Sequence, residues 1–249
     1  MIIIKNHDEI AIMRKAGRIL GETLLLLEKE VKPGITTANL DRIAEEFITK
    51  HGAKPSFKGL YGFPSSLCIS VNEQVIHGFP GEYVLKEGDI VSIDCGASYD
   101  GFHGDAARTF PVGNVSVEAQ KLIDITRESF FHGIKFAREG HKLTDISHGI
   151  QSYVEAAGFS VVRDFVGHGI GRKVHEDPNV PNFGKSGRGP KLVEGMVLAI
   201  EPMVNAGTYK VKTLKDGWTV VTEDASLSAH YENTVAILSD GPEILTLIK

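Results

Sequence analysis

Two aspartates in a predicted β-hairpin are the first residues of this sequence that could share one chemical task. Asp94 ends a run rich in β-branched residues, and Asp105 opens the second strand. The Asp-Gly pair at 100–101 favours a tight turn between antiparallel strands. With that turn the numbers of facing residues sum to about 201, so Asp94 faces Ala107 and has Asp105 as its diagonal neighbour on the same face. Because two such acids repel unless a cation lies between them, the hairpin indicates either half of a metal site or a solvated polar face.

A short internal duplication adds further acids and two histidines. Segments 87–94 and 194–201 match position by position: each reads Glu-Gly, then apolar residues, then Ile and an acid. The second acid is Glu201, and the match divides the chain into two similar halves, about 1–112 and 113–249. A His-Gly pair precedes each of these acids and a further acid follows it, which gives His77 and Asp105 in the first half and His168 and Glu232 in the second. Matched acids of two similar halves would meet along the axis that relates the halves.

These residues form an oxygen-rich ligand set of four carboxylates and one imidazole: Asp94, Asp105, Glu201, Glu232 and His168. The set is too acidic for one tetrahedral zinc site and suits two divalent ions that share bridging carboxylates. Cobalt, manganese, iron, zinc and nickel all accept such ligands. Two ions about 3.5 to 4 Å apart can activate a water molecule and polarise a carbonyl, which is the chemistry of amide or ester hydrolysis. His77 and His175 are left over and could act as hydrogen-bond donors or proton carriers on the substrate.

Helices and antiparallel strands are expected to position these side chains. Apolar residues recur every three or four positions in four stretches, which predicts four helices. The first covers 8–31, and the second runs from a cap at Thr36 or Thr37 to 51. The third runs from a cap at Ser116 to 137 and the fourth from a cap at Thr144 to 157. Besides the hairpin, strands are predicted over 67–71, 159–162, 196–201, 218–222, 234–238 and 244–248. The loop over 54–64 is rich in Pro, Gly and aromatic residues, a composition suited to a pocket wall. The mixed order predicts an α/β chain of the α+β type.

The composition excludes several classes of protein. The chain has 249 residues, 42% hydrophobic and 24% charged, which is typical of a globular protein with a large core. A net charge of -5 gives no reason to expect nucleic acid as substrate. Because the apolar start is too short for a signal peptide and no run approaches a membrane span, we expect a cytoplasmic protein. Cys68 and Cys95 imply neither a disulfide framework nor a thiolate metal site.

Several separated motifs, in one order, resemble the type I methionine aminopeptidases over nearly the whole chain. The motifs are Ile93-Asp94, Gly101 to Asp105, Gly167 to Arg172, His175-Glu176, Ile200 to Pro202 and Ser228 to Glu232. The resemblance implies a single catalytic domain over 1–249 with the pseudo-twofold pita-bread fold, in which helices flank a central curved antiparallel sheet. That arrangement agrees with the duplication.

The resemblance also implies a role for each candidate ligand. Asp94 would chelate the first metal ion, Asp105 and Glu232 would bridge both ions, and His168 and Glu201 would complete the second. Glu201 would also be the general base. Of the remaining histidines, His77 would contact the amino end or leaving amide of the substrate, and His175 would donate to the scissile carbonyl.

The methionine side chain would lie in an apolar pocket formed by Phe57, Leu60, Phe63, Cys68 and Trp218, where a flexible thioether fits well. The expected activity is removal of the initiator methionine from new proteins whose second residue is small. The expected partners are nascent polypeptide N-termini, including those at the ribosome, and we expect a monomer without nucleic acid or membrane partners. Two alternatives remain open: an aminopeptidase of the same fold that cleaves before proline, and a metal-free module that binds peptides.

Overall fold

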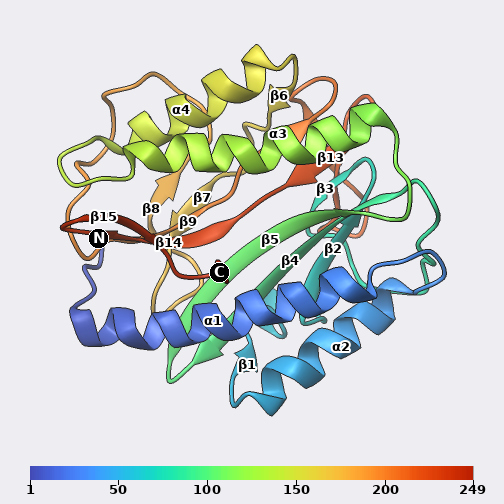
Figure 1. Cartoon of the computed structure of the whole chain (residues 1–249), viewed down its shortest axis with the longest axis horizontal. Helices are drawn as coiled ribbons and strands as arrows, with labels where there is room; N and C mark the ends of the chain where they lie inside the picture. Colours follow the sequence, from blue (N-terminus) through green and yellow to red (C-terminus); the bar gives the residue numbers. More distant parts are fainter. Residues whose placement is uncertain (249) are drawn as a thin grey trace.

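Helices cover two sides of a layer of antiparallel strands in the computed structural model, which describes residues 1–248. Figure 1 shows α1 and α2 along one side of the strands and α3 and α4 along the other. Over the described residues the α-helices are α1 (His7–Glu30), α2 (Thr37–Lys50), α3 (Val117–Gly133) and α4 (Leu143–Ala156). Two 3-10 turns, Leu60–Gly62 and Ile134–Phe136, accompany them. No helix of this part of the chain is long and apolar enough to cross a membrane.

The strands of residues 1–248 form four hydrogen-bonded sheets, in which every pairing is antiparallel. The first contains β1 (Lys54–Pro55), β2 (Leu67–Val71), β4 (Ile90–Tyr99) and β5 (Phe102–Pro111). The second runs in the order β15 (Gly241–Ile244), β14 (Asn233–Leu238), β9 (Val197–Ile200), β7 (Gly167–Gly169) and β8 (Glu176–Val180). The third sheet has the order β13 (Ser228–His230), β10 (Met203–Asn205) and β6 (Ser160–Val161). The fourth has the order β11 (Val211–Thr213), β12 (Val220–Thr222) and β3 (Gln74–Ile76). The predicted class is confirmed, with the expected sheet divided into these parts; the division into two halves near residue 112 stays a prediction.

The β4–β5 hairpin has the predicted register. Asp94 pairs with Ala107 and Gly96 with Asp105, so the two acids are diagonal neighbours. Asp100 and Gly101 have φ of 47° and 77°, the positive values that a type I′ turn requires. The prediction that Asp94 ends its strand is wrong, because β4 continues to Tyr99. The small residues after Asp94 keep the pleat and pair with both β1 and β5.

Strand β5 joins the first sheet to the segment that carries Glu232. Backbone bonds run both ways between Ala107 and Glu232, at 3.3 and 3.0 Å. Beside them, the Thr234 hydroxyl accepts from the Asp105 N–H and donates to the Asp105 carbonyl, both at 2.9 Å. Thr109 makes the equivalent pair of bonds to the backbone of the facing segment. Acids from distant parts of the sequence are therefore held side by side.

Helix α1 lies directly on β5. Its N-cap is a capping box in which Asn6 accepts from the Glu9 N–H at 2.9 Å and the Glu9 carboxylate accepts from the Asn6 N–H at 3.1 Å. A Cβ added at Gly17 would lie 2.3 Å from the Leu245 carbonyl oxygen, and Gly17 also faces Gly104 of β5. The fully buried apolar side of the helix includes Met13, Leu20 and Leu27. Burial of each such side chain stabilises the fold by about 1.5 to 3 kcal/mol.

Helix α4 begins earlier than predicted, at Leu143, with Lys142 as its N-cap residue. The Asp145 carboxylate accepts from the Lys142 N–H at 2.8 Å. Thr144 does not cap the helix, because its hydroxyl donates to the carbonyl of Arg188 and accepts from the N–H of Arg188. The predicted cap instead anchors a neighbouring loop.

Candidate metal centre and its cavity

Every predicted site residue lines one cavity of about 890 Å³. The candidate ligands on its wall come from both larger sheets and the turns beside them. Asp94 lies in the middle of β4, Asp105 in β5 and His168 in β7, while Glu201 directly follows β9 and Glu232 lies between β13 and β14. The other lining residues that were predicted are His77, His175, Phe57, Leu60, Phe63, Cys68 and Trp218.

The acids and His168 converge on a common space at the bottom of the cavity. The Nε2 atom of His168 lies 3.8 Å from Asp105 Oδ2 and 3.7 Å from Glu201 Oε1. One ligand atom each from Asp105, His168 and Glu232 all lie within 4.8 Å of one another. These separations are longer than hydrogen bonds and are close to those between ligands of one ion.

Buried atoms without partners make this space suitable for cations. Asp94 Oδ1, Asp105 Oδ1 and Glu232 Oε1 are buried and have no hydrogen-bond partner. A buried acceptor without a partner is costly, and a carboxylate is costlier than a neutral group. Divalent ions prefer such oxygen and imidazole donors, so the residues fit the metal site that the sequence suggested.

The charge of the acids is strongly disfavoured without a cation. Burial, followed by the neighbouring carboxylates, raises the pKa of Asp94, Glu201 and Glu232 well above the ordinary range. Burial raises the pKa of Asp105 to about 7. The folded chain without metal therefore holds protons that cations would displace.

Neutral imidazoles surround the acids. Burial, followed by the proximity of His175, lowers the pKa of His77 and of His168 to about 4. Burial also lowers the pKa of His175. Near neutral pH these rings are uncharged, which is the form that binds metal or exchanges a proton with a substrate.

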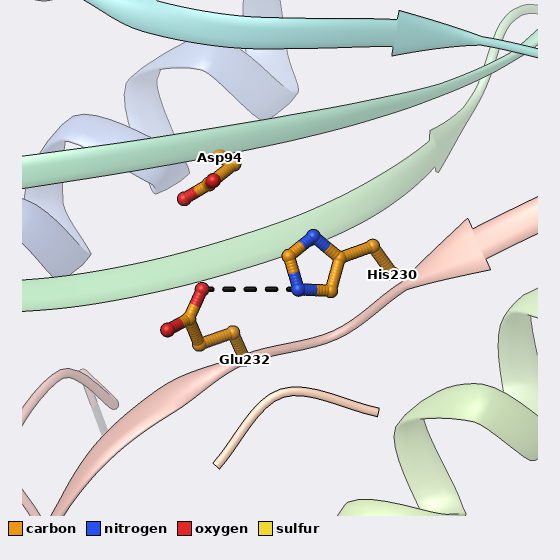
Figure 2. A group of neighbouring side chains, drawn as sticks. All are labelled: Asp94, His230 and Glu232. Carbon is orange, nitrogen blue, oxygen red and sulfur yellow. Dashed lines mark ion pairs between the residues drawn. The ribbon is translucent and has the colours of Figure 1, made fainter. Parts of the chain in front are cut away.

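His230 also belongs to this centre, although the sequence analysis gave it no role. Figure 2 shows its ring beside Asp94 and Glu232, with the line to Glu232 marking a separation of 3.8 Å between Nε2 and Oε2. Ligand atoms of Asp94, His230 and Glu232 lie within 4.8 Å of one another. Burial, then repulsion by His77 and Arg108, lowers the pKa of His230 to about 3. Its position two residues before Glu232 was the available signal, because alternate residues of an extended chain share a face.

The five predicted pocket residues pack together beside the acids. Phe57, Phe63, Cys68 and Val174 form a buried cluster, against which Leu60, Phe79 and Trp218 pack. The ring centroids of Phe63 lie 5.2 Å from those of Phe79 and of Trp218. Phe79 and Val174 were not predicted as members of this cluster. The cavity is thus lined by an apolar cluster as well as by the acids and histidines.

A buried ion pair supports the segment that carries His175. Lys5 Nζ lies 2.6 Å from Glu176 Oε2, and the side chains of Lys5 and Glu176 are only 2% and 3% exposed. The backbone N–H of Lys5 donates to the carbonyl of Gly195 at 2.8 Å, which fixes the start of the chain next to this loop. The His175 ring stacks on the Tyr61 ring, with 5.8 Å between the ring centroids, and its centroid lies 4.5 Å from that of the His168 ring. The pair was not foreseen from the sequence.

Known proteins match the chain over its full length. The model of metallopeptidase family M24 matches residues 11–239. A methionine aminopeptidase of Clostridium perfringens is 78% identical over 249 residues, covering 100% of both chains. Methionine aminopeptidase 1 of Bacillus subtilis is 56% identical over 248 residues, with 100% of both chains covered. The crystal structure of a methionine aminopeptidase from Thermotoga maritima superposes with a TM-score of 0.98 at 47% identity, covering 100% of both chains. The chain therefore belongs to metallopeptidase family M24 and, within it, to the methionine aminopeptidases.

Proposed function

We propose that this chain removes the N-terminal methionine of proteins and peptides whose second residue is small, with two divalent ions in its cavity. The methionine aminopeptidase activity follows from its full-length relatives, and membership of a metallopeptidase family implies metal ions. The number of ions, their ligands and the second-residue preference are our proposal. One observation supports it above the others: buried carboxylate oxygens without partners face neutral imidazoles in a cavity that a peptide can enter.

Asp94, Asp105, His168, Glu201 and Glu232 would hold the ions, with Asp105 and Glu232 shared between them. The chemistry that such ions supply is polarisation of a carbonyl and a lowered pKa of a water molecule. Cobalt, manganese, iron, zinc and nickel all accept this donor set, so availability would decide which is used.

Protons move through the chain's own side chains. The Glu201 carboxylate accepts the proton of the attacking water and delivers it to the amine that leaves. His175, at the rim of the cavity, donates an N–H to the oxygen of the scissile carbonyl. His77 contacts the amino end or the leaving amide of the substrate. Each neutral ring can play this part near pH 7 because burial lowers its pKa.

The apolar side of the cavity selects methionine. Phe57, Leu60, Phe63, Cys68 and Trp218 would surround the unbranched thioether, which aromatic rings contact favourably. The enzyme would act as a monomer in the cytoplasm on nascent N-termini, including those at the ribosome. The net charge of -5 agrees with the absence of nucleic acid from this scheme.

A panel of peptides tests the proposal. Met-Ala and Met-Gly peptides should release methionine in the presence of Mn²⁺, Co²⁺ or Fe²⁺, whereas Leu-, Ala- and X-Pro-starting peptides should remain intact. Asp94→Asn should abolish release while the protein still unfolds cooperatively. The control Asp240→Asn, at an exposed position, should leave release unchanged. Equal cleavage of all peptides would refute the methionine specificity, and an active Asp94→Asn variant would refute the site.

A further inference from the structure

We propose that His230 is a ligand of the ion on the Asp94 side, so that each of the two ions is bound by one imidazole. The inference rests on the proposed two-ion site and adds a ligand to it. The ions would share Asp105 and Glu232 as proposed above, with His168 and Glu201 on one side and Asp94 and His230 on the other. Each imidazole belongs to a group of three donors whose ligand atoms lie within 4.8 Å of one another.

The relation of His230 to the acids repeats that of His168. His168 Nε2 lies 3.7 Å from one oxygen of Glu201 and 3.8 Å from Asp105. His230 Nε2 lies 3.7 Å from the other oxygen of Glu201 and 3.8 Å from Glu232. The two rings therefore approach the Glu201 carboxylate from its two oxygens, at matching distances. The separations from carboxylate oxygens that make His168 a candidate ligand are thus matched at His230.

The distances from His230 Nε2 to the two acids, 3.7 and 3.8 Å, exceed hydrogen-bond length and lie slightly above the spacing of two ligands of one ion. An N–H···O bond spans about 2.7 to 3.2 Å, and His230 Nε2 is further than that from both acids. Ligand atoms about 2.1 Å from one ion lie roughly 3 to 3.5 Å apart at octahedral or tetrahedral angles. The His230 side chain is only 2% exposed, and its Nε2 atom is buried without a hydrogen-bond partner. Figure 2 shows this ring directed to the space between Asp94 and Glu232.

The backbone of His230 is held by hydrogen bonds and its side chain is almost fully buried, so the ring has little freedom before any ion binds. Its N–H donates to the Thr109 hydroxyl at 2.8 Å, and its carbonyl accepts from the same hydroxyl at 2.9 Å. Thr109 lies on β5, four residues after Asp105. A ligand held in this way loses little freedom on binding, which strengthens the site.

A second imidazole has a chemical consequence. Nitrogen donors raise the affinity for iron, cobalt, nickel and zinc relative to magnesium and calcium, which prefer oxygen alone. With one histidine per ion, both positions should retain such ions. Both ions should then bind with comparable strength.

The test counts imidazoles per bound ion. Wild-type protein stripped of metal and reloaded with Co²⁺ should show about one imidazole per cobalt in X-ray absorption spectra, because two histidines serve two ions. His230→Gln should lower this to about one half, and His168→Gln should do the same. His148→Gln, which removes an exposed histidine of α4, should leave the count unchanged.

Calorimetric titration with Co²⁺ gives a second readout that needs no activity. One of the two binding equivalents should weaken by at least about 10- to 100-fold in His230→Gln. His230→Ala should weaken it too, which excludes an effect of the glutamine itself, and circular dichroism verifies that both variants are folded.

The outcomes separate this inference from the function on which it rests. Two ions per wild-type chain with an unchanged imidazole count in both His230 variants would overturn the inference and leave the two-ion proposal intact. A single ion per wild-type chain, held with His168 as its only nitrogen donor, would overturn both. Two ions with one imidazole each, lost selectively in the His230 variants, would support both.

Discussion

Removing divalent ions should make the folded protein progressively less stable as the pH rises above about 6.5. In the absence of metal, burial and mutual repulsion raise the pKa of Asp94, Glu201 and Glu232 well above the ordinary value, and that of Asp105 to about 7. In the unfolded chain the same groups titrate near pH 4. The folded state then holds protons that the unfolded state has lost. The stability that these acids contribute is fully present below about pH 4 and is lost as the pH rises through the raised values.

The buried histidines act in the opposite direction, but only at lower pH. The pKa values of His77 and His168 are lowered to about 4 and that of His230 to about 3, against about 6.5 in the unfolded chain. Their contribution is present above about pH 6.5 and is lost as the pH falls toward those values. Between about pH 4 and 6.5 the effects of the acids and of the histidines on the pH dependence of stability largely cancel. Above about pH 6.5 only the acids still bind protons in the folded state that the unfolded state has lost, so stability should fall as the pH rises.

The expected size follows from linkage. Each carboxyl that stays protonated in the folded state costs about 1.4 kcal/mol of stability per pH unit. For a chain of this length, one such group lowers the melting temperature by about 3 to 6 °C between pH 6.5 and 7.5. An ion at about 100 times its dissociation constant should stabilise the fold by about 2.7 kcal/mol, or about 5 to 11 °C.

Thermal melts at pH 6.5, 7.5 and 8.5, with EDTA or with Mn²⁺, measure both effects. Glu232→Gln should flatten the decline seen in EDTA, because it removes one of the buried acids. The exposed Asp240→Asn should keep it. A metal-free melting temperature that stays constant or rises over this range would refute the electrostatic reasoning, and an absence of stabilisation by metal would refute the site.

Three further substitutions test how the site is supported. Lys5→Met should destabilise the protein by about 3 to 5 kcal/mol in urea unfolding, because it leaves Glu176 buried without its partner. Adding Glu176→Leu should restore stability. A Lys5→Met single variant as stable as the wild type would contradict the role of the pair. Thr234→Val should lower the free energy of unfolding by about 1 to 3 kcal/mol, because the N–H and the carbonyl of Asp105 both lose their hydrogen bonds to the Thr234 hydroxyl. Thr234→Ser keeps a hydroxyl and should lower it much less. Trp218→Ala should raise KM for Met-Gly peptides by about 10-fold or more with a smaller change in kcat, as expected for lost apolar contacts to the methionine; an unchanged KM would remove Trp218 from the pocket.

Local signals predicted the hairpin, and long-range contacts explain where prediction failed. The Asp-Gly turn alone sets the register, so the pairing of Asp94 with Ala107 could be predicted. Beyond Asp94, β4 continues through its pairing with β5 up to the turn, and the added pairing with β1 is a long-range contact that local composition does not reveal. Strand β8 was missed because it is polar and contains Pro178. The proline is tolerated there because β8 is an edge strand, paired only with β7 among the described residues.

The candidate site shows the same division. Its acids and His168 could be recognised because motifs with fixed spacing carry them. The ion pair of Lys5 and Glu176 joins residues 171 positions apart, and such a contact leaves no local pattern. His230 lay inside a recognised motif, yet its part depends on which face of the extended segment points to Asp94, and that is decided by the bonds to Thr109.

Release of free methionine as a function of added ion tests the central claim most directly. Protein stripped of metal should not cleave a Met-Gly peptide, and titration with Mn²⁺ or Co²⁺ should restore cleavage until the site is filled. Mass spectrometry of the peptide should show loss of one methionine and nothing further. Cleavage at the same rate in the presence of a chelator, or continued removal of residues after the methionine, would contradict the account.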